Sequence, residues 1–428
     1  MEDVLEFKKK WFRLDNSAKI YPAVLNPKDS CVFRVSANLM QDVEPEVLQR
    51  AVTECKPRFP SFYVRLRRGL FWNYYEHNEK DPIVKPESPY INQHINIHAN
   101  NGYHFTVFHY RNRISLEVFH GLCDAYAALE FLKALTFRYF MLLGYPLQSD
   151  GAVLDPDQPP RGIEVEDSFV KNYTPEGNGR TDVQNAYRIM GTRFAGGIGA
   201  IHGRMQTEQL AALAKANGAT VTQYLAALLT YSIRESDDAA KRSKKPINIC
   251  IPVNIRKYYS SVTLRNFSLY FHVSTECNNR EWSFEAILDN VKKTFKSELT
   301  LSKLQQKLNA NVAAEKNIAL RLCPLFLKNI ALKFAVIVLG DKLNTCALSN
   351  IGHTMLPPSM ARLVKDFDCT LGVGNVATNS VSVVSCNGST AICFSRSIQE
   401  TEIERLFFTC LADQGMDIEI QSNLWENH

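Results

Sequence analysis

The segment ISLEVFHGLCDAYAALEFLKALTFRY, from Ile114 to Tyr139, is typical of a β-strand that runs through a short turn into an α-helix. Apolar residues alternate with other types from Ile114 to Val118, which predicts a strand with one apolar face. His120 falls next on that apolar side. The pattern therefore predicts a titratable imidazole that points inward from the end of a strand and could accept a proton there.

Asp124 stands immediately before a helical pattern of apolar residues that continues to Leu135. Aspartate is favoured at the residue that precedes the first turn of a helix, where its carboxylate accepts backbone N–H groups. We therefore expect Asp124 to brace the turn that presents His120.

The spacing H-x-x-x-D alone is weak evidence, because the chain has 10 histidines and contains a second match from His77 to Asp81. Asn, Lys and Pro surround this second match, and no apolar strand precedes it. We interpret it as a solvated loop. For His120 the residues alone leave one alternative open, a core histidine whose ring is satisfied by a backbone carbonyl.

The chain has 428 residues, of which 45% are hydrophobic, enough for two domain-sized cores. Its net charge is only +5 and its basic runs are short and scattered, so we expect no nucleic-acid partner. His202, His272 and His353 lack a carboxylate or cysteine at metal-ligand spacing, so we expect no metal site.

The cysteines and the first residues bear on location. Eleven cysteines without a C-x-x-C pair favour reduced thiols. The first stretch, MEDVLEFKKKWFRLDN, lacks the apolar run of a signal peptide. Both observations predict a cytoplasmic protein.

The most hydrophobic region, from Asn317 to Gly340, is interrupted by Arg321, Pro324, Lys328 and Lys333. It does not contain the run of ~18 uncharged residues that a membrane-spanning helix requires. We predict a buried helix here. Weak association with a membrane surface is the alternative, because the cations stand among leucine and phenylalanine residues.

The order of predicted elements divides the chain into two αβ halves. The first, residues 1–178, carries the His120 motif and ends in a long crossover rich in Pro, Gly and Asp, and the second is residues 179–428. The elements predicted with most detail are a strand pair at Phe62–Arg67 and Leu70–Glu76, a hairpin at His104–Tyr110 and Ile114–His120, a buried strand at Ile247–Asn254, and one long helical stretch at Trp282–Leu308.

Further segments accompany the FHGLCDA turn at Phe119–Ala125. These are PVNIRKYYSSVTLRNF at Pro252–Phe267, LSNIG at Leu348–Gly352, RFPSFYVRLRRGLFW at Arg58–Trp72, and WFRLDN near the start. Together they resemble the superfamily of chloramphenicol acetyltransferases and peptide-synthetase condensation domains, with its H-H-x-x-x-D-G motif, its "PVNLR … RN" strand and loop and its S-N-x-G segment. The resemblance is closest to the alcohol-acetyltransferase-like, condensation-like bacterial branch and covers nearly the whole chain.

Two residues depart from the superfamily pattern. Phe119 replaces the first histidine of its motif, and Ala125 replaces the glycine. The first histidine is dispensable in acetyltransferase-type members, so Phe119 argues against peptide-bond condensation. His120 and Asp124, the pair that the motif needs for proton transfer, are both present.

The resemblance implies an α/β (α+β) fold of two chloramphenicol-acetyltransferase-like lobes, each a mixed sheet packed with helices, with a channel between them. It further implies an acyltransferase for groups other than aminoacyl groups. Acyl-CoA or a phosphopantetheinyl thioester would be the co-substrate, an alcohol or amine the acceptor, and no cofactor would be bound permanently. In such a channel His120 would act as a general base on the acceptor, without an acyl-enzyme.

The resemblance also implies roles for residues around His120. Asp124 would be structural and pair with an arginine, for which Arg256 is the candidate, with Arg265 behind it. Asn266 and Ser349 are candidates for the oxyanion donor, and Asn350 for a substrate contact. Read without the resemblance, Arg256 could equally be a surface residue, and Asn266 and Asn350 could be turn formers.

Three alternatives to a CoA-dependent enzyme remain open. A condensation-like enzyme would take its acyl group from a carrier protein's phosphopantetheine arm. A non-catalytic homologue would keep the channel and lack turnover, against which the presence of His120 and Asp124 argues. A hydrolase with Cys123 as nucleophile is the third, although nothing in the sequence indicates a lowered pKa for its thiol.

Overall fold

The computed structural model describes residues 11–25, 30–175, 184–278, 282–335, 341–374 and 377–423. A five-stranded sheet carries the strand that precedes His120. Its order is β12–β2–β7–β6–β5, and its neighbours are antiparallel except for β5 and β6. The strands are β2 (Val32–Leu39), β5 (Val84–Pro86), β6 (Phe105–Tyr110), β7 (Arg113–Phe119) and β12 (Val364–Thr370).

A seven-stranded sheet forms the second half of the centre, in the order β10–β9–β11–β13–β14–β8–β15. Strand β11 runs parallel to both of its neighbours, and the other pairs are antiparallel. The strands are β8 (Gly199–Gln206), β9 (Ile247–Asn254), β10 (Ser268–Thr275), β11 (Cys346–His353), β13 (Asn379–Cys386), β14 (Ser389–Arg396) and β15 (Glu419–Ser422).

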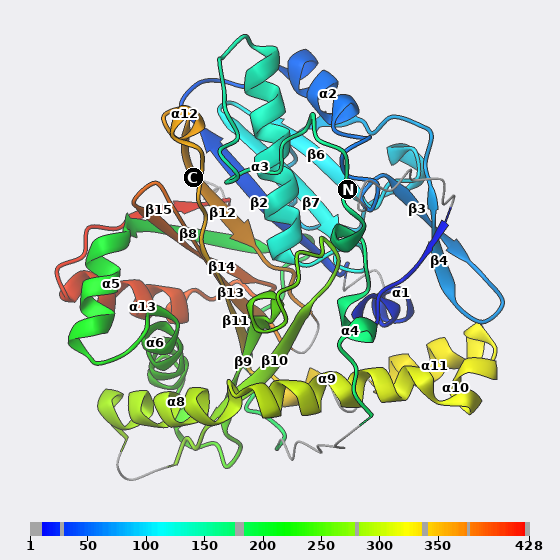
Figure 1. The fold of residues 1–428 in the computed structure, drawn as a ribbon. Helices are drawn as coiled ribbons and strands as arrows, with labels where there is room; N and C mark the ends of the chain where they lie inside the picture. The colour runs from blue at the N-terminus through cyan, green and yellow to red at the C-terminus, as the bar shows by residue number, and fades with distance from the viewer. Residues whose placement is uncertain are drawn as a thin grey trace.

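A small third sheet, β1–β4–β3, lies at the side of the molecule near the N-terminal segment (Figure 1). Its strands are β1 (Trp11–Arg13), β3 (Val64–Arg68) and β4 (Asn73–His77). The helices are α1 (Tyr21–Val24), α2 (Pro45–Glu54), α3 (Ala125–Leu142), α4 (Ser168–Lys171), α5 (Thr207–Ala216), α6 (Val221–Glu235), α7 (Asp238–Lys241), α8 (Phe284–Glu298), α9 (Leu301–Lys316), α10 (Ile318–Leu322), α11 (Leu325–Ala335), α12 (Pro358–Ala361) and α13 (Glu402–Asp413).

Each large sheet has its own hydrophobic core. Helices α2 and α3 cover the five-stranded sheet, while α5, α6, α8 and α13 cover the seven-stranded one (Figure 1). Strand β12 joins the two parts, because it pairs with β2 and also packs against β13 and β14. The predicted α/β class with two mixed, helix-covered sheets is therefore confirmed.

The predicted hairpins are confirmed close to their expected ends. Strands β6 and β7 pair about Arg111 and Asn112, and β3 pairs with β4. In β7 the alternating residues Ile114, Leu116 and Val118 all enter the core. The other face of β7 is buried as well, because Glu117 accepts hydrogen bonds from Arg34 at 2.8 and 3.1 Å. Paired charges make that burial tolerable.

The single long helix predicted for Trp282–Leu308 is wrong, because the chain forms two helices there, α8 and α9. Helix α8 ends at Glu298, and Thr300 caps the start of α9 by accepting a hydrogen bond from the Lys303 backbone N–H at 3.3 Å. A threonine in this position is a normal helix start.

The buried helix predicted for Asn317–Gly340 is also wrong for the part that the structure describes, residues 317–335. Pro324 separates two short helices, α10 and α11, and most of their large apolar side chains are exposed. Leu325 and Lys328 are the buried residues of α11. Residues 336–340 lie outside the described part. Within the described residues, no helix is long and apolar enough to cross a membrane.

The division of the chain at residues 178 and 179 remains a prediction, because residues 176–183 lie outside the described part. The chain does not separate cleanly into two sequential sheets. Strand β12 comes from the second half and completes the sheet of the first half at its β2 edge.

Candidate active site

His120 follows the last residue of β7 and is held on three sides. Its backbone N–H donates to the Cys31 carbonyl at 2.8 Å. Its ring stacks on Tyr21, with 4.5 Å between the ring centroids, and meets the edge of Phe33 at 5.2 Å. These contacts fix the plane of the imidazole. Burial lowers the pKa of His120 below its ordinary value of 6.5, because the imidazolium is poorly solvated there.

A chain of hydrogen bonds fixes which ring nitrogen carries the proton. His120 Nδ1 lies 3.2 Å from Asn266 Oδ1. Asn266 Nδ2 in turn donates to Asp15 Oδ2 at 3.2 Å, which orients the amide. Because an amide oxygen can only accept, Nδ1 must be the protonated nitrogen, and Nε2 of the neutral ring keeps its lone pair. The arrangement therefore sets His120 up as a proton acceptor.

Asp15 is fully buried at the end of this chain. The Ala18 backbone N–H donates to its Oδ1 at 2.8 Å, and Arg265 Nε lies 3.6 Å from its Oδ2. Burial raises the pKa of Asp15, and the Arg265 charge opposes that effect. Asp15 therefore orients Asn266 from a position that solvent does not reach.

Asp124 and Arg256 lie in direct contact, as the resemblance implied. Arg256 Nη1 and Nη2 donate to the two carboxylate oxygens at 2.8 and 3.0 Å. The backbone N–H groups of Ala127 and Phe267 donate to the same carboxylate at 3.1 and 2.9 Å. Both side chains are buried. The pair thus joins the start of α3 to the chain that enters β10. Its two parallel N–H···O bonds are the geometry of a bidentate ion pair that holds two segments together.

Cys123 does not fit the role of a nucleophile. Its side chain is fully buried in the core of the first sheet, and burial raises the pKa of the thiol well above its usual range. A nucleophilic cysteine needs a lowered pKa and access to substrate.

Ser349 and Asn350, on β11, line the same cavity as His120. This cavity has a volume of about 420 Å³ and takes its walls from both large sheets. The Asn350 side chain is already engaged, since its Nδ2 donates to Thr222 Oγ1 at 2.8 Å and its Oδ1 accepts from the Gly352 N–H at 2.9 Å. The structure therefore brings His120, Asp124, Ser349 and Asn350 to one cavity, with Arg256, Arg265 and Asn266 behind it.

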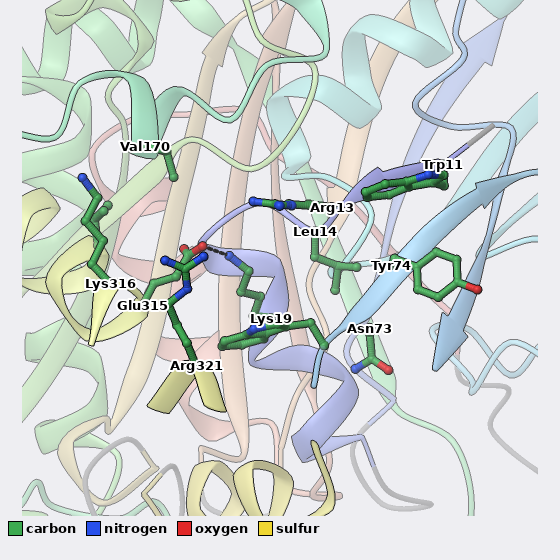
Figure 2. A pocket seen from close by; sticks show the side chains of 12 residues that line it. Trp11, Arg13, Leu14, Lys19, Asn73, Tyr74, Val170, Glu315, Lys316 and Arg321 are labelled. Carbon is green, nitrogen blue, oxygen red and sulfur yellow. Dashed lines mark ion pairs between the residues drawn. The ribbon is translucent and has the colours of Figure 1, made fainter. Parts of the chain in front are cut away.

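A second cavity, of about 560 Å³, is lined by Trp11, Arg13, Leu14 and Lys19 from the start of the same N-terminal segment. Figure 2 shows its cations, which include Arg13, Lys19 and Arg321, around a space bordered by Tyr74. Lys19 forms an ion pair with Glu315 there. None of the site residues expected from the sequence lines this cavity, whereas four of them line the smaller His120 cavity.

In the described ranges, no group of three or more His, Cys, Asp or Glu residues could hold a metal ion. The fold does bring Cys393 within 3.2 Å and Asp368 within 3.7 Å of His202 Nδ1, a cluster that sequence spacing did not reveal. Arg204 occupies the same Asp368 carboxylate at 2.8 Å.

Sequence reasoning missed Asp15 and Tyr21. Both precede the first large strand and reach His120 only because residues 11–25 fold across the turn. Asp15 stands 251 positions from Asn266, so no local pattern connects them. The one available signal was WFRLDN, which the resemblance included without assigning a role to its aspartate.

No protein-family model and no curated protein match the chain, but many solved structures do. The TRI3 trichothecene 15-O-acetyltransferase of Fusarium sporotrichioides matches with a TM-score of 0.59 and 12% identity, over 94% of each chain. TRI101 of F. sporotrichioides, solved with coenzyme A and T-2, gives 0.63 and 10% over 96% of this chain and 100% of that one. The first condensation domain of the CDA synthetase gives 0.56 and 11% over 94% and 95%.

At these identities the matches establish the fold. Over nearly all of its length the chain has the fold shared by TRI3, TRI101 and this condensation domain. The resemblance seen in the sequence is therefore confirmed for the architecture. The neighbours include an acetyltransferase, a protein bound to coenzyme A and a condensation domain.

Proposed function

We propose that this protein is an acyltransferase for groups other than aminoacyl groups. It would move an acyl group from an acyl-CoA thioester to a hydroxyl or amine acceptor. The observation that carries the proposal is the bond from His120 Nδ1 to Asn266, which leaves the Nε2 lone pair available in a cavity lined by both sheets. Because its pKa is lowered, this imidazole is uncharged at neutral pH and can accept a proton.

The proposed reaction is a direct transfer. His120 Nε2 takes the proton of the acceptor as the acceptor oxygen or nitrogen attacks the thioester carbonyl. The tetrahedral oxyanion then collapses, the carbon–sulfur bond breaks, and the imidazolium returns the proton to the leaving thiolate. The products are the acylated acceptor and free coenzyme A, and the enzyme ends in its starting state without a bound cofactor.

The oxyanion needs a donor from the wall that faces His120. Of the two candidates, Asn266 lies behind the imidazole, with its Oδ1 at His120 Nδ1 and its Nδ2 donating to the buried Asp15. Ser349 lines the cavity from β11, so we assign the oxyanion to its hydroxyl. Asp124 and Arg256 hold the turn in place, and Asn266 and Asp15 hold the imidazole.

The cavity lining also bears on the substrates. Ile20, Val24, Phe33, Leu371 and Val373 contribute apolar surface to it. Such a lining favours an uncharged acyl or acceptor group over a charged one. A carrier-protein thioester remains the second candidate donor, because the fold is shared with a condensation domain.

The proposal is tested by incubating the purified chain with alcohols or amines and one of two donors, a panel of acyl-CoAs or an acylated carrier protein, and following free thiol release. His120→Ala serves as the inactive control. Thiol release that depends on both acceptor and His120 would support the proposal. Release only from an acyl carrier protein would assign the condensation-like reaction, and no release from either donor would identify a non-catalytic homologue.

A further inference from the structure

Helices α10 and α11 present their apolar side chains to solvent. Ile318, Leu322, Phe326, Ile330 and Phe334 recur at every fourth position and are 64–73% exposed. Within α11 this spacing places Phe326, Ile330 and Phe334 on one side of the helix. A helix on a globular protein normally turns such a stripe inward. Here the stripe faces out.

Polar bonds hold α11 in this reversed orientation. The buried Lys328 donates through Nζ to the Phe71 carbonyl at 2.9 Å and lies 3.6 Å from the centre of the Trp72 ring. The Leu325 backbone N–H donates to the Leu70 carbonyl at 2.9 Å. The exposure of the stripe is therefore built into the contacts on the inner side of α11.

The tip of the β3–β4 hairpin extends the exposed surface. Leu70 and Phe71 are both exposed, and the bond from Leu325 ties them to the start of α11. We define the apolar face as these two residues together with Ile318, Leu322, Phe326, Ile330 and Phe334. Figure 1 shows α10 and α11 together at the edge of the molecule, beyond the C-terminal end of α9.

The charged side chains in the segments that carry the apolar face, residues 68–72 and 316–335, are all cationic. Arg68, Arg321 and Lys333 are exposed beside it, and residues 316–335 contain no Asp or Glu. Two carboxylates that flank these segments are bound by cations, Glu315 by Lys19 and Glu76 by Arg65 and Arg67. A partner of this face must therefore be apolar and negatively charged at its border.

We propose that the apolar face docks on the surface of a bilayer that contains anionic lipids. The phenylalanine and aliphatic side chains would enter the boundary between headgroups and acyl chains, and the arginines and Lys333 would lie at the lipid phosphates. The chain lies on the membrane in this arrangement and does not cross it.

The test is flotation of the full chain with phosphatidylcholine vesicles and with vesicles that also contain phosphatidylglycerol. We expect binding to the anionic vesicles that weakens as salt is added. The triple variant Phe326→Ser, Ile330→Ser and Phe334→Ser should lower partitioning on the order of 100-fold. The matched control, Met190→Ser with Met355→Ser and Ile420→Ser, alters exposed apolar residues elsewhere and should bind like the wild type.

Charge variants provide a second measurement that leaves the apolar stripe unchanged. Arg321→Gln with Lys333→Gln should bind anionic vesicles more weakly than wild type and lose part of the salt dependence. Equal binding of all variants, or no wild-type binding to either vesicle, would overturn the proposal. Self-association without lipid that the triple variant abolishes would overturn it in favour of a second copy of the chain. Flotation involves no turnover, so its failure is distinct from failure of the acyltransferase proposal.

Discussion

Two buried carboxylates approach the same short stretch of chain, residues 265–267, from opposite sides. Asp124 accepts hydrogen bonds from Nη1 and Nη2 of Arg256 and from the backbone N–H of Phe267. Asp15 receives the amide of Asn266 and lies 3.6 Å from Arg265. The first carboxylate is connected to the backbone of two distant segments, while the second is connected through one amide to the imidazole of His120.

This difference in contacts assigns the two carboxylates different roles, one in the stability of the fold and one in the proposed reaction. No hydrogen bond between Asp124 and the His120 ring is recorded among the described residues, although the two stand in one motif. Asp15, which no motif marks, orients the group that holds His120 Nδ1. We therefore expect substitutions at Asp124 to lower mainly the free energy of unfolding, and substitutions at Asp15 or Asn266 to lower mainly kcat.

The largest effect is expected at His120. Replacing it by alanine removes the proton acceptor and should lower acyl transfer by roughly 10²–10⁴-fold without loss of the fold, since His120 lines the cavity and is not part of the hydrophobic core. Thiol release and circular dichroism measure the two parts. His77→Ala, in the other H-x-x-x-D match, is the control and should keep full activity. Wild-type-like turnover of His120→Ala would falsify the mechanism.

The Asp124–Arg256 pair should give the largest effect on stability. Asp124→Asn and Arg256→Met each leave a buried charge without its partner, so each should lower the free energy of unfolding by about 3–5 kcal/mol. The double variant should cost less than the sum, because the two share one interaction. Urea denaturation measures all three.

An exposed pair supplies the control for that cycle. Glu76→Gln removes a carboxylate bound by Arg65 and Arg67 at the surface and should cost far less than either buried change, because water screens the charges there. Strictly additive losses at Asp124 and Arg256 would mean that their contact carries no energy of its own.

Asn266→Ala should reduce kcat, because it frees the imidazole to rotate or change tautomer. It should also lower the free energy of unfolding by about 1–3 kcal/mol, because the buried Asp15 carboxylate loses a donor. We expect a loss of kcat of roughly 10–100-fold, as for residues that orient metal-bound histidines. Asp15→Asn should act in the same direction through the amide. A positioning role predicts that the pH profile of kcat changes as well, whereas a loss confined to stability at unchanged kcat would refute it.

The pH dependence follows from the lowered pKa of His120. The neutral base is the active form, so kcat/KM should stay level through neutral pH and fall only as pH drops through a value below 6.5. The decline should track one ionisation. A decline that already begins above pH 6.5 would show that the imidazole is not shielded from water as the structure indicates.

The smallest effect is expected at Cys123. Its thiol is buried and protonated, so Cys123→Ala should keep most of the activity. Mass spectrometry after incubation with the thioester alone should detect no acyl group on the protein. An acylated peptide containing Cys123 would instead indicate a covalent route.

The sequence allowed the His120 turn, both hairpins and the general fold to be predicted, because each depends on local periodicity or on a motif with its context. The Asp124 cap was predictable for the same reason. The break between α8 and α9 also had a local signal, since Thr300 is a good N-cap, but the apolar pattern runs through it. Local signals thus identified elements better than their ends.

The remaining features depend on contacts between distant segments. Asp15 and Tyr21 reach His120 across the chain, and neither lies in a periodic element near it. The exposure of α10 and α11 depends on Lys328 finding the Phe71 carbonyl, a contact that hydrophobicity alone would not predict. Hydrophobic composition indicates that burying a segment is favourable, but it does not identify the surface against which the segment packs.

The pairing of β2 with β12 affects how the chain folds while it is being synthesised. Asn38 and Asp366, which bond across this pair at 2.6 Å, are 328 positions apart. At usual rates of translation, β2 would leave the ribosome roughly 15 s to a minute before its partner is made. During that time β2 is an unpaired edge that could recruit strands from other nascent chains. The order of synthesis therefore makes this edge the part of the molecule with most need of a chaperone.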